Sequence, residues 1–384
     1  MNSLTVPARS DASLRPVPWR RMAWVTWRQH RIALAGVAAF LGVLAVWLWI
    51  AGASLRRAYA ATACHPASPA CADLITSFNN MNHVLIGGYV LQAVPALIGA
   101  FAGAPVLARE LETGTFRYAW TQGFGRWRWT LAKLVPLAAA VAAAAGASSV
   151  LFTWYYQPYF ATGNQALSLS EAPPLAAGLF DLRGVAFAAW TLAAFAIGAL
   201  AGMLIRRVVP AIVATLAAYT GLALVAGNLL RQHYLTPLVT SNPNVPGSAL
   251  VLSQWWTHGG KFAFTGQPPN DLLMRLCPNA PAGVFGKPSH LTFFQCLAQH
   301  GYPTWTSYQP ASRFWLFQWI EGGWLLALSV LLTAVTVWLV RRRWRRLSGP
   351  GCRPWRAGLP AAWPRPAVAA AGRAGQLPVL WRAC

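Results

Sequence analysis

Acidic residues are scarce in this chain of 384 residues. Only eight Asp and Glu stand against 31 Lys and Arg, and charged residues make up 10% of the sequence, whereas a soluble globular protein carries about 25%. No polar stretch is long enough to form a soluble domain of its own. These shortages exclude an ordinary soluble domain. They also argue against a nucleic-acid binder, which carries its positive charge on a polar surface.

Groups of residues that carry catalysis are missing as well. The sequence has no H-E-x-x-H and no G-x-S-x-G motif, and its apolar segments contain neither His nor Asp. The lysines that follow a glycine, Lys261 and Lys287, lack the earlier glycine that a P-loop requires. We therefore expect no enzyme activity, no ATP hydrolysis by this chain alone, and no metal or cofactor bound to it.

Long apolar runs are abundant instead. Hydrophobic residues make up 56% of the chain, and about 20 helical residues suffice to cross a hydrocarbon core of about 30 Å. Six segments reach that length: 32–55, 85–107, 131–154, 184–205, 208–230 and 320–340. The sequence therefore predicts an all-α membrane protein with six transmembrane helices.

Two of these segments carry pairs of glycines at a four-residue spacing. Gly99 and Gly103 lie in the second segment, and Gly198 and Gly202 lie in the fourth. Small residues at this spacing let helix backbones approach closely. We expect these two helix faces to pack on protein rather than on lipid.

The basic residues indicate the orientation of the six helices. With the N-terminus inside, the inner segments hold 23 Lys and Arg and the outer segments hold eight. Such an excess is typical of cytoplasmic segments. We expect both termini in the cytoplasm, a multi-pass protein of the plasma membrane, and attraction to anionic lipid of the bilayer. The net charge of +23 then reflects topology, and nucleic acid is not implied.

The two ends of the chain differ from the spans between them. Residues 1–31 form a cytoplasmic or interfacial segment whose Trp and Arg residues suit either a flank of the first span or a separate interfacial helix. Residues 32–346 form the six-span domain. The first apolar run is too long for a secretory signal, so we expect it to be retained. Residues 347–384 are rich in Pro and Arg, and we expect them to be disordered.

The longest outer segment, 231–319, is too apolar for a linker and predicts a compact, loop-rich extracellular cap. The outer loops each hold an even number of cysteines, so we expect one disulfide between Cys64 and Cys71 and another between Cys277 and Cys296. A metal site remains an alternative because His258, His290 and His300 lie in the same segment as Cys277 and Cys296.

Glu321 is the only acidic residue at a boundary of these spans. A carboxylate inside a membrane marks a functional site by default. Its position beside Trp319 and Gly322, at the outer end of the last span, favours a solvated interfacial carboxylate instead.

The inner segment 108–133 is the most distinctive part of the sequence. Gly114 is expected to end the helix that extends from the second span, and Thr115 can cap a short helix over residues 116–122. Phe116, Tyr118 and Trp120 would give that helix bulky anchors. Such a surface suits a partner protein, and a position in the lipid headgroup layer remains the alternative.

At these residues the sequence resembles the membrane subunits of type 2 ABC transporters, the six-span exporter permeases, and among them an actinobacterial branch. The match consists of Glu110, Glu112, Gly114, Thr115, Phe116 and Arg117, followed by residues 119–122 and 126–133. Residues 308–321 also resemble that branch. The long cysteine-bearing cap and the Pro-rich tail depart from the pattern.

The resemblance implies a permease that exports an unidentified substrate with a separate P-loop ATPase subunit, which would bind ATP and Mg²⁺. It also implies a second permease half, for which a homodimer is expected. The residues expected at the ATPase coupling site are Glu110, Glu112, Gly114, Thr115, Phe116, Arg117, Tyr118 and Trp120. The alternative functions are a non-transporting membrane sensor or assembly protein and, with less support, a membrane enzyme.

Overall fold

The computed structural model describes part of the chain. The described residues are 19–61, 70, 73, 91–114, 126–161, 174–242, 245–246, 248–266, 268–277 and 289–345. The helices are α1 (Trp19–Ala61), α4 (Ala93–Ile98), α5 (Ala104–Thr113), α7 (Arg126–Ala161), α8 (Ala177–Phe180), α9 (Gly184–Ile205), α10 (Val208–Val225), α11 (Asn270–Leu276), α12 (Ser289–Gln299) and α13 (Phe314–Arg345). Two π-helical turns are η1 (Gly99–Gly103) and η3 (Ala226–Leu230), and two 3₁₀ turns are η4 (Arg231–His233) and η5 (Ala311–Arg313).

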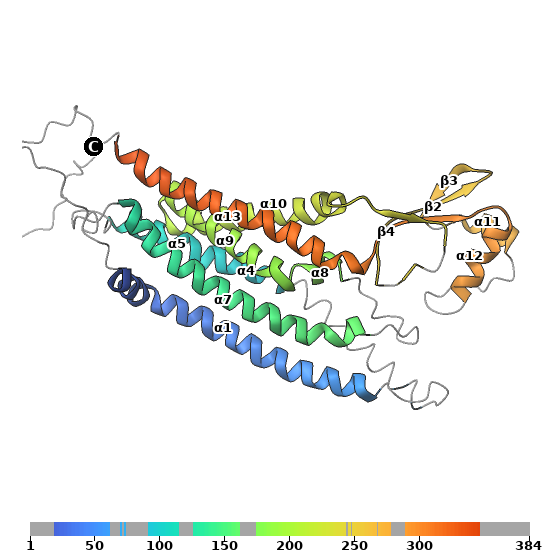
Figure 1. Ribbon diagram of the computed structural model, residues 1–384, viewed down its shortest axis with the longest axis horizontal. Coiled ribbons are helices and arrows are strands. Elements are labelled where there is room, and N and C mark those ends of the chain that lie inside the picture. Colours follow the sequence, from blue (N-terminus) through green and yellow to red (C-terminus); the bar gives the residue numbers. More distant parts are fainter. Residues whose placement is uncertain are drawn as a thin grey trace, which may run out of the picture.

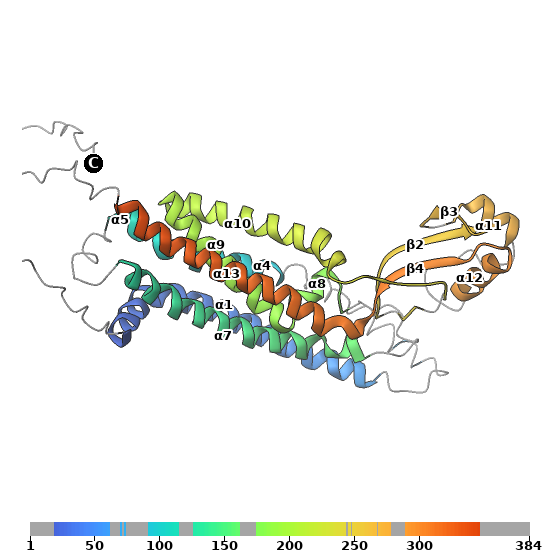
Figure 2. The same ribbon diagram turned by 45° about the horizontal axis from the view of Figure 1, so that its top comes forward.

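Six helical stretches are long and apolar enough to cross a membrane. They are Ala35–Ala61, Ala93–Thr113, Trp127–Pro158, Gly184–Ile205, Val208–His233 and Ala311–Arg342. The six expected spans are therefore confirmed. The long helices run side by side in one elongated bundle, with the cap beyond one end of it (Figures 1 and 2).

Helix α9 is the centre of the bundle, because it packs on α13, α5, α7, α10 and α4. The glycine pairs make this packing possible. A Cβ atom on Gly198 would lie 2.3 Å from the carbonyl oxygen of Gly99, and one on Gly103 would lie 2.6 Å from the carbonyl oxygen of Phe195. Backbones this close leave no room for a side chain. The expectation that both glycine faces pack on protein is confirmed.

Helix α1 packs chiefly on α7, at the edge of the bundle. Toward the C-terminal ends of both helices Trp49 stacks on Trp154 with ring centroids 4.8 Å apart, and the Arg56 guanidinium donates to the Trp154 carbonyl at 2.9 Å. The described part of α1 is one continuous helix from residue 19, and its first turns are angled away from the remainder (Figure 2). Residues 19–31 are thus helical and continuous with the first span, and they bend away from its axis (Figure 2).

The cap contains a four-stranded antiparallel sheet that the sequence analysis missed. Its strands are β1 (Leu238–Thr240), β2 (Leu250–His258), β3 (Lys261–Thr265) and β4 (Thr304–Gln309), in the order β1-β4-β2-β3. Trp256 on β2 is buried and stacks between Phe264 and Phe294. The cap is therefore organised by a sheet and an aromatic core rather than by loops alone.

Candidate functional site

A cluster of buried charged side chains lies at the end of the bundle next to the cap (Figure 1). Arg231, in η4, is 3% exposed, and Glu321, on α13, is fully buried. The guanidinium donates two hydrogen bonds to the Glu321 carboxylate, from Nη2 to Oε1 at 2.8 Å and from Nε to Oε2 at 3.1 Å. Nη2 also pairs with the carboxylate of Asp181, between α8 and α9. One cation therefore holds two carboxylates from different elements.

Neighbouring donors complete the coordination of these carboxylates. Trp190 on α9 donates its indole N–H to Glu321 at 2.8 Å, and the Tyr234 hydroxyl donates to Glu321 at 3.3 Å. Gln92, just before α4, donates to Asp181 at 3.1 Å. The network thereby joins α4, α9, η4 and α13, together with the turn before α9. Buried polar networks of this kind select one arrangement of the elements that they join.

The electrostatics of this cluster favour a proton on Asp181. Burial is the largest effect on that carboxyl and, with the nearby Glu321 carboxylate, raises the pKa of Asp181 to about 8, although Arg231 acts in the opposite direction. Two carboxylates face a single guanidinium, so protonation of Asp181 leaves the cluster neutral. Burial beside Glu321 also raises the pKa of Tyr234 above its ordinary value, which keeps its hydroxyl protonated as a donor.

The interpretation of Glu321 as a solvated interfacial carboxylate is wrong. Its side chain is fully buried because Arg231, Trp190 and Tyr234 supply the hydrogen bonds that water would otherwise make. Sequence reasoning flagged Glu321 but missed Asp181 and Arg231 as its partners. The only signal was a single arginine at the outer end of the fifth apolar run.

Three of the residues expected to couple to an ATPase, Glu110, Glu112 and Gly114, lie at the end of the bundle opposite the cap (Figure 1). Glu110, near the end of α5, forms an ion pair with Lys133 on α7, whose side chain is 5% exposed. The Lys133 ammonium also lies 4.3 Å from the centre of the Trp129 ring. This pair ties together the two helices that flank residues 114–125.

Glu112 contacts a third helix. Its carboxylate accepts a hydrogen bond at 3.1 Å from the backbone N–H of Val208, the first residue of α10. A helix N-terminus has free N–H groups and favours a negative charge, so Glu112 supplies the cap that Arg207 cannot. Gly114 ends α5 in the left-handed conformation with φ +72°, as the sequence predicts.

The remaining expected coupling residues lie outside the described residues. They are Thr115, Phe116, Arg117, Tyr118 and Trp120. The short helix expected over 116–122 therefore stays a prediction. Within the described part of this region, Glu110 contacts α7, Glu112 contacts α10, and Gly114 ends α5.

The cap cysteines are joined as expected. Cys277 and Cys296 form a disulfide, which confirms that pairing, whereas Cys64 and Cys71 lie outside the described residues and their pairing stays a prediction. Cys277, Cys296 and His300 place potential ligand atoms within 4.8 Å of one another. Metal thiolate ligands must be free and deprotonated, and the disulfide uses both sulfurs. The metal alternative is therefore not supported.

Comparison with known protein families identifies a match over part of the chain. A family described as ABC-2 membrane transporter related matches residues 38–231, about half of the chain. That range covers the second, third and fourth spans, nearly all of the first and the fifth, and the segment between α5 and α7. No curated protein and no solved structure matches the chain.

Proposed function

Because the chain belongs to the ABC-2 membrane transporter related family, we propose that it is the membrane-spanning permease subunit of an ATP-driven ABC transporter. The family and the six apolar helices make it a multi-pass protein of the plasma membrane. In the proposed transporter a separate P-loop ATPase subunit binds ATP and Mg²⁺, and a second copy of this chain forms the other permease half.

The arrangement around residues 114–125 carries the proposal. Glu110 ties α5 to α7, and Glu112 ties α5 to α10. α5 and α7 flank the segment, so a partner that pulls on it acts on both helices and, through Glu112, on α10. All three helices pack on α9 at the centre of the bundle. Force at one cytoplasmic segment thus reaches four of the six spans.

The finer parts of the proposal rest on two segments, residues 110–117 and 308–321, that resemble six-span exporters of the actinobacterial branch. They are outward transport, membership of that six-span exporter class, and direct docking of the helix expected over 116–122 on the ATPase. The substrate is left unassigned, because an apolar, Ala-rich bundle suits any lipid-facing protein.

Substitutions in the coupling segment test the proposal. Trp120→Ala removes the largest expected anchor, and loss of an interface anchor costs about 2 kcal/mol, or about thirtyfold in affinity. Tyr118→Pro should be as harmful, since proline damages a helix beyond its first turn. The measurement is co-purification of the ATPase and transport in membranes with equal amounts of each variant.

Trp363→Ala, in the Pro-rich tail, is the matched control and should behave like wild type. If Trp120→Ala and Tyr118→Pro also behave like wild type, the segment is a headgroup-layer helix and the coupling assignment is lost. If no P-loop ATPase co-purifies with wild type, the membrane sensor or assembly protein becomes the better description.

The orientation has its own test. Reporter fusions at Asn164 and Gln267 should report the outside of the cell, since both lie in segments poor in Lys and Arg. A cytoplasmic signal at either site would contradict the six-span topology with cytoplasmic termini.

A further inference from the structure

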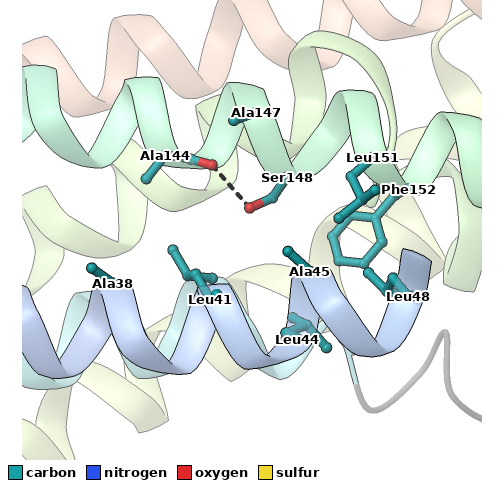
Figure 3. A pocket seen from close by; sticks show the side chains of 11 residues that line it. Ala38, Leu41, Leu44, Ala45, Leu48, Ala144, Ala147, Ser148, Leu151 and Phe152 are labelled. Carbon is teal, nitrogen blue, oxygen red and sulfur yellow. Dashed lines mark hydrogen bonds between the residues drawn. The ribbon is translucent and has the colours of Figure 1, made fainter. Parts of the chain in front are cut away.

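Two hollows lie on the sides of the bundle, and they differ in charge. The hollow between α1 and α7, about 300 Å³ in volume, is lined by apolar side chains and one hydroxyl, that of Ser148. This hydroxyl donates to the Ala144 carbonyl of its own helix at 2.9 Å (Figure 3). No charged residue lines this hollow. It therefore offers nothing that would select one ligand from the surrounding hydrocarbon.

The second hollow is a groove of about 550 Å³ between α7, α9 and α13. Its lining includes Leu131 and Ala138 of α7, Ala196 of α9, and Leu326, Ala334 and Arg341 of α13. The groove exists because α13 and α7 each pack closely on α9 but touch one another far less. Small side chains on all three helices, such as Ala138, Ala196 and Ala334, keep it open.

The walls of the groove suit an acyl chain. Its two hydroxyl groups are satisfied within α13, because Ser329 donates to the Leu325 carbonyl at 2.7 Å and Thr333 donates to the Ser329 carbonyl at 2.8 Å. From Leu326 to Arg341 the helix rises about 22 Å at 1.5 Å per residue. One leaflet of hydrocarbon is about 15 Å deep. The groove thus runs from one headgroup layer to beyond the middle of the bilayer.

The mouth of the groove suits an anionic headgroup. Arg341 is exposed there, and none of the three ion pairs among the described residues includes it. Arg128 lies one turn before the lining residue Leu131, on the same face of α7. Trp338, half exposed beside Arg341, is the residue type that anchors at the membrane interface.

The described carboxylates at this end of the bundle do not neutralise these arginines. Its inner segments hold three acidic residues, Asp11, Glu110 and Glu112, against 23 basic ones. Glu110 is bound to Lys133, and Glu112 is bound to the N-terminus of α10. No described carboxylate at this end is thus left to pair with Arg341, and anionic lipid is the counter-charge that a membrane supplies at this depth.

We propose that the groove between α7, α9 and α13 binds one anionic phospholipid of the cytoplasmic leaflet. Its phosphate lies at Arg341, and one acyl chain follows α13 toward Leu326. The choice of leaflet rests on the orientation given under the proposed function. Binding itself requires neither the ATPase nor transport, so it is tested separately from that function.

The test is native mass spectrometry of the purified full-length chain in detergent, titrated with phosphatidylglycerol or with phosphatidylcholine of the same acyl chains. Wild type should retain one phosphatidylglycerol in preference to phosphatidylcholine. Arg341→Gln should weaken the binding of phosphatidylglycerol about fivefold, since one basic residue at a membrane surface is worth about 1 kcal/mol. It should leave phosphatidylcholine unchanged. Ala334→Phe fills the groove and should abolish retention of both lipids.

Two controls match these variants. Leu331→Phe adds the same ring on an exposed face of α13 that does not line the groove, and Arg342→Gln removes a charge from the neighbouring position. Both should retain phosphatidylglycerol like wild type. Arg341 is exposed at the end of its helix, so Arg341→Gln keeps the test valid if Ala334→Phe fails to fold.

Three results would overturn the proposal. Equal retention of the two lipids by wild type would mean that the headgroup is not recognised. If Arg341→Gln and Arg342→Gln lose phosphatidylglycerol retention equally, the lipid is attracted to the basic end of α13 without a specific site. A change of oligomeric state in Ala334→Phe, without a change in lipid retention, would mean that a second copy of the chain occupies the groove.

Discussion

The two ends of the helix bundle are held together in different ways. At the end next to the cap, which is the outer end in the proposed orientation, the Arg231 guanidinium binds two carboxylates inside a network that is almost closed to solvent. At the opposite end, which is cytoplasmic in the proposed orientation, two carboxylates act separately. Glu110 pairs with Lys133, and Glu112 caps α10 from an exposed position.

The difference predicts different mechanical behaviour. A shared buried network fails as a whole when one member is lost, and its members are strongly coupled energetically. Separate contacts on separate helices fail one at a time and add. The outer end is therefore expected to act as a fixed hub, while the cytoplasmic end is a set of joints that can change independently. The following predictions break or sharpen this contrast.

Arg231→Leu should have the largest effect. It leaves Asp181 and Glu321 buried together without a cation, and breaking a buried ion pair costs about 3–5 kcal/mol. Thermal unfolding in lipid nanodiscs should show a large fall in Tm. The cap variant Lys261→Met, which removes an exposed charge, should leave Tm nearly unchanged.

The combined variant Arg231→Leu with Asp181→Asn and Glu321→Gln should recover much of this loss, because no uncompensated charge remains buried. If the combined variant is no more stable than Arg231→Leu alone, the guanidinium acts by packing against Phe180, which lies 4.4 Å away, and not as the charge at the centre of a hub.

Lys133→Met should have the next largest effect. It keeps the apolar stem against Trp129 but leaves the part-buried Glu110 without its partner, at a cost of about 1–3 kcal/mol. The Glu110→Gln, Lys133→Met double variant should be closer to wild type in Tm. If the fall in Tm of the double variant equals the sum of the falls in the two single variants, the pairing of Glu110 with Lys133 is contradicted.

The pH dependence of stability should come from the outer hub. The folded pKa of Asp181, about 8, exceeds the ordinary value of about 3.9, so the folded chain holds a proton that the unfolded chain releases. The stability from this proton is complete below about pH 4 and is lost as the pH rises through about 8, by at most about 1.4 kcal/mol per pH unit.

Tm should therefore fall between about pH 7 and about pH 8, and Asp181→Asn should flatten that fall. Glu112→Gln serves as the control from the other end of the bundle and should keep the wild-type slope. An unchanged slope in Asp181→Asn would assign the titration to another group.

Glu112→Ala should have the smallest effect, about 0.5–1 kcal/mol, typical of a lost helix cap. Glu112→Gln retains a hydrogen-bond acceptor and should lose only part of that stability, since the charge at a helix N-terminus is worth about 0.3–1 kcal/mol. In the double variant Glu112→Ala, Lys133→Met, the two losses in Tm should add. Strong coupling between them would mean that the cytoplasmic end is also one network.

The sequence by itself determined the six spans, because span length, apolar composition and the scarcity of charge are local properties of each segment. It also predicted the close packing at Gly198 and the pairing of Cys277 with Cys296, since small residues and cysteines in one outer segment have few other uses. The end of α5 at Gly114 followed from the same kind of local rule.

Only the tertiary structure decided how the charges and the cap are arranged. Arg231 is 50 residues from Asp181 and 90 from Glu321, and it directly follows the π-helical turn η3, which shifts the helical phase that a regular period would give. The cap sheet likewise pairs β2 with β4 across the segment that contains α11 and α12. Whether a carboxylate is buried or solvated depends on which distant donors reach it, and no local pattern encodes that.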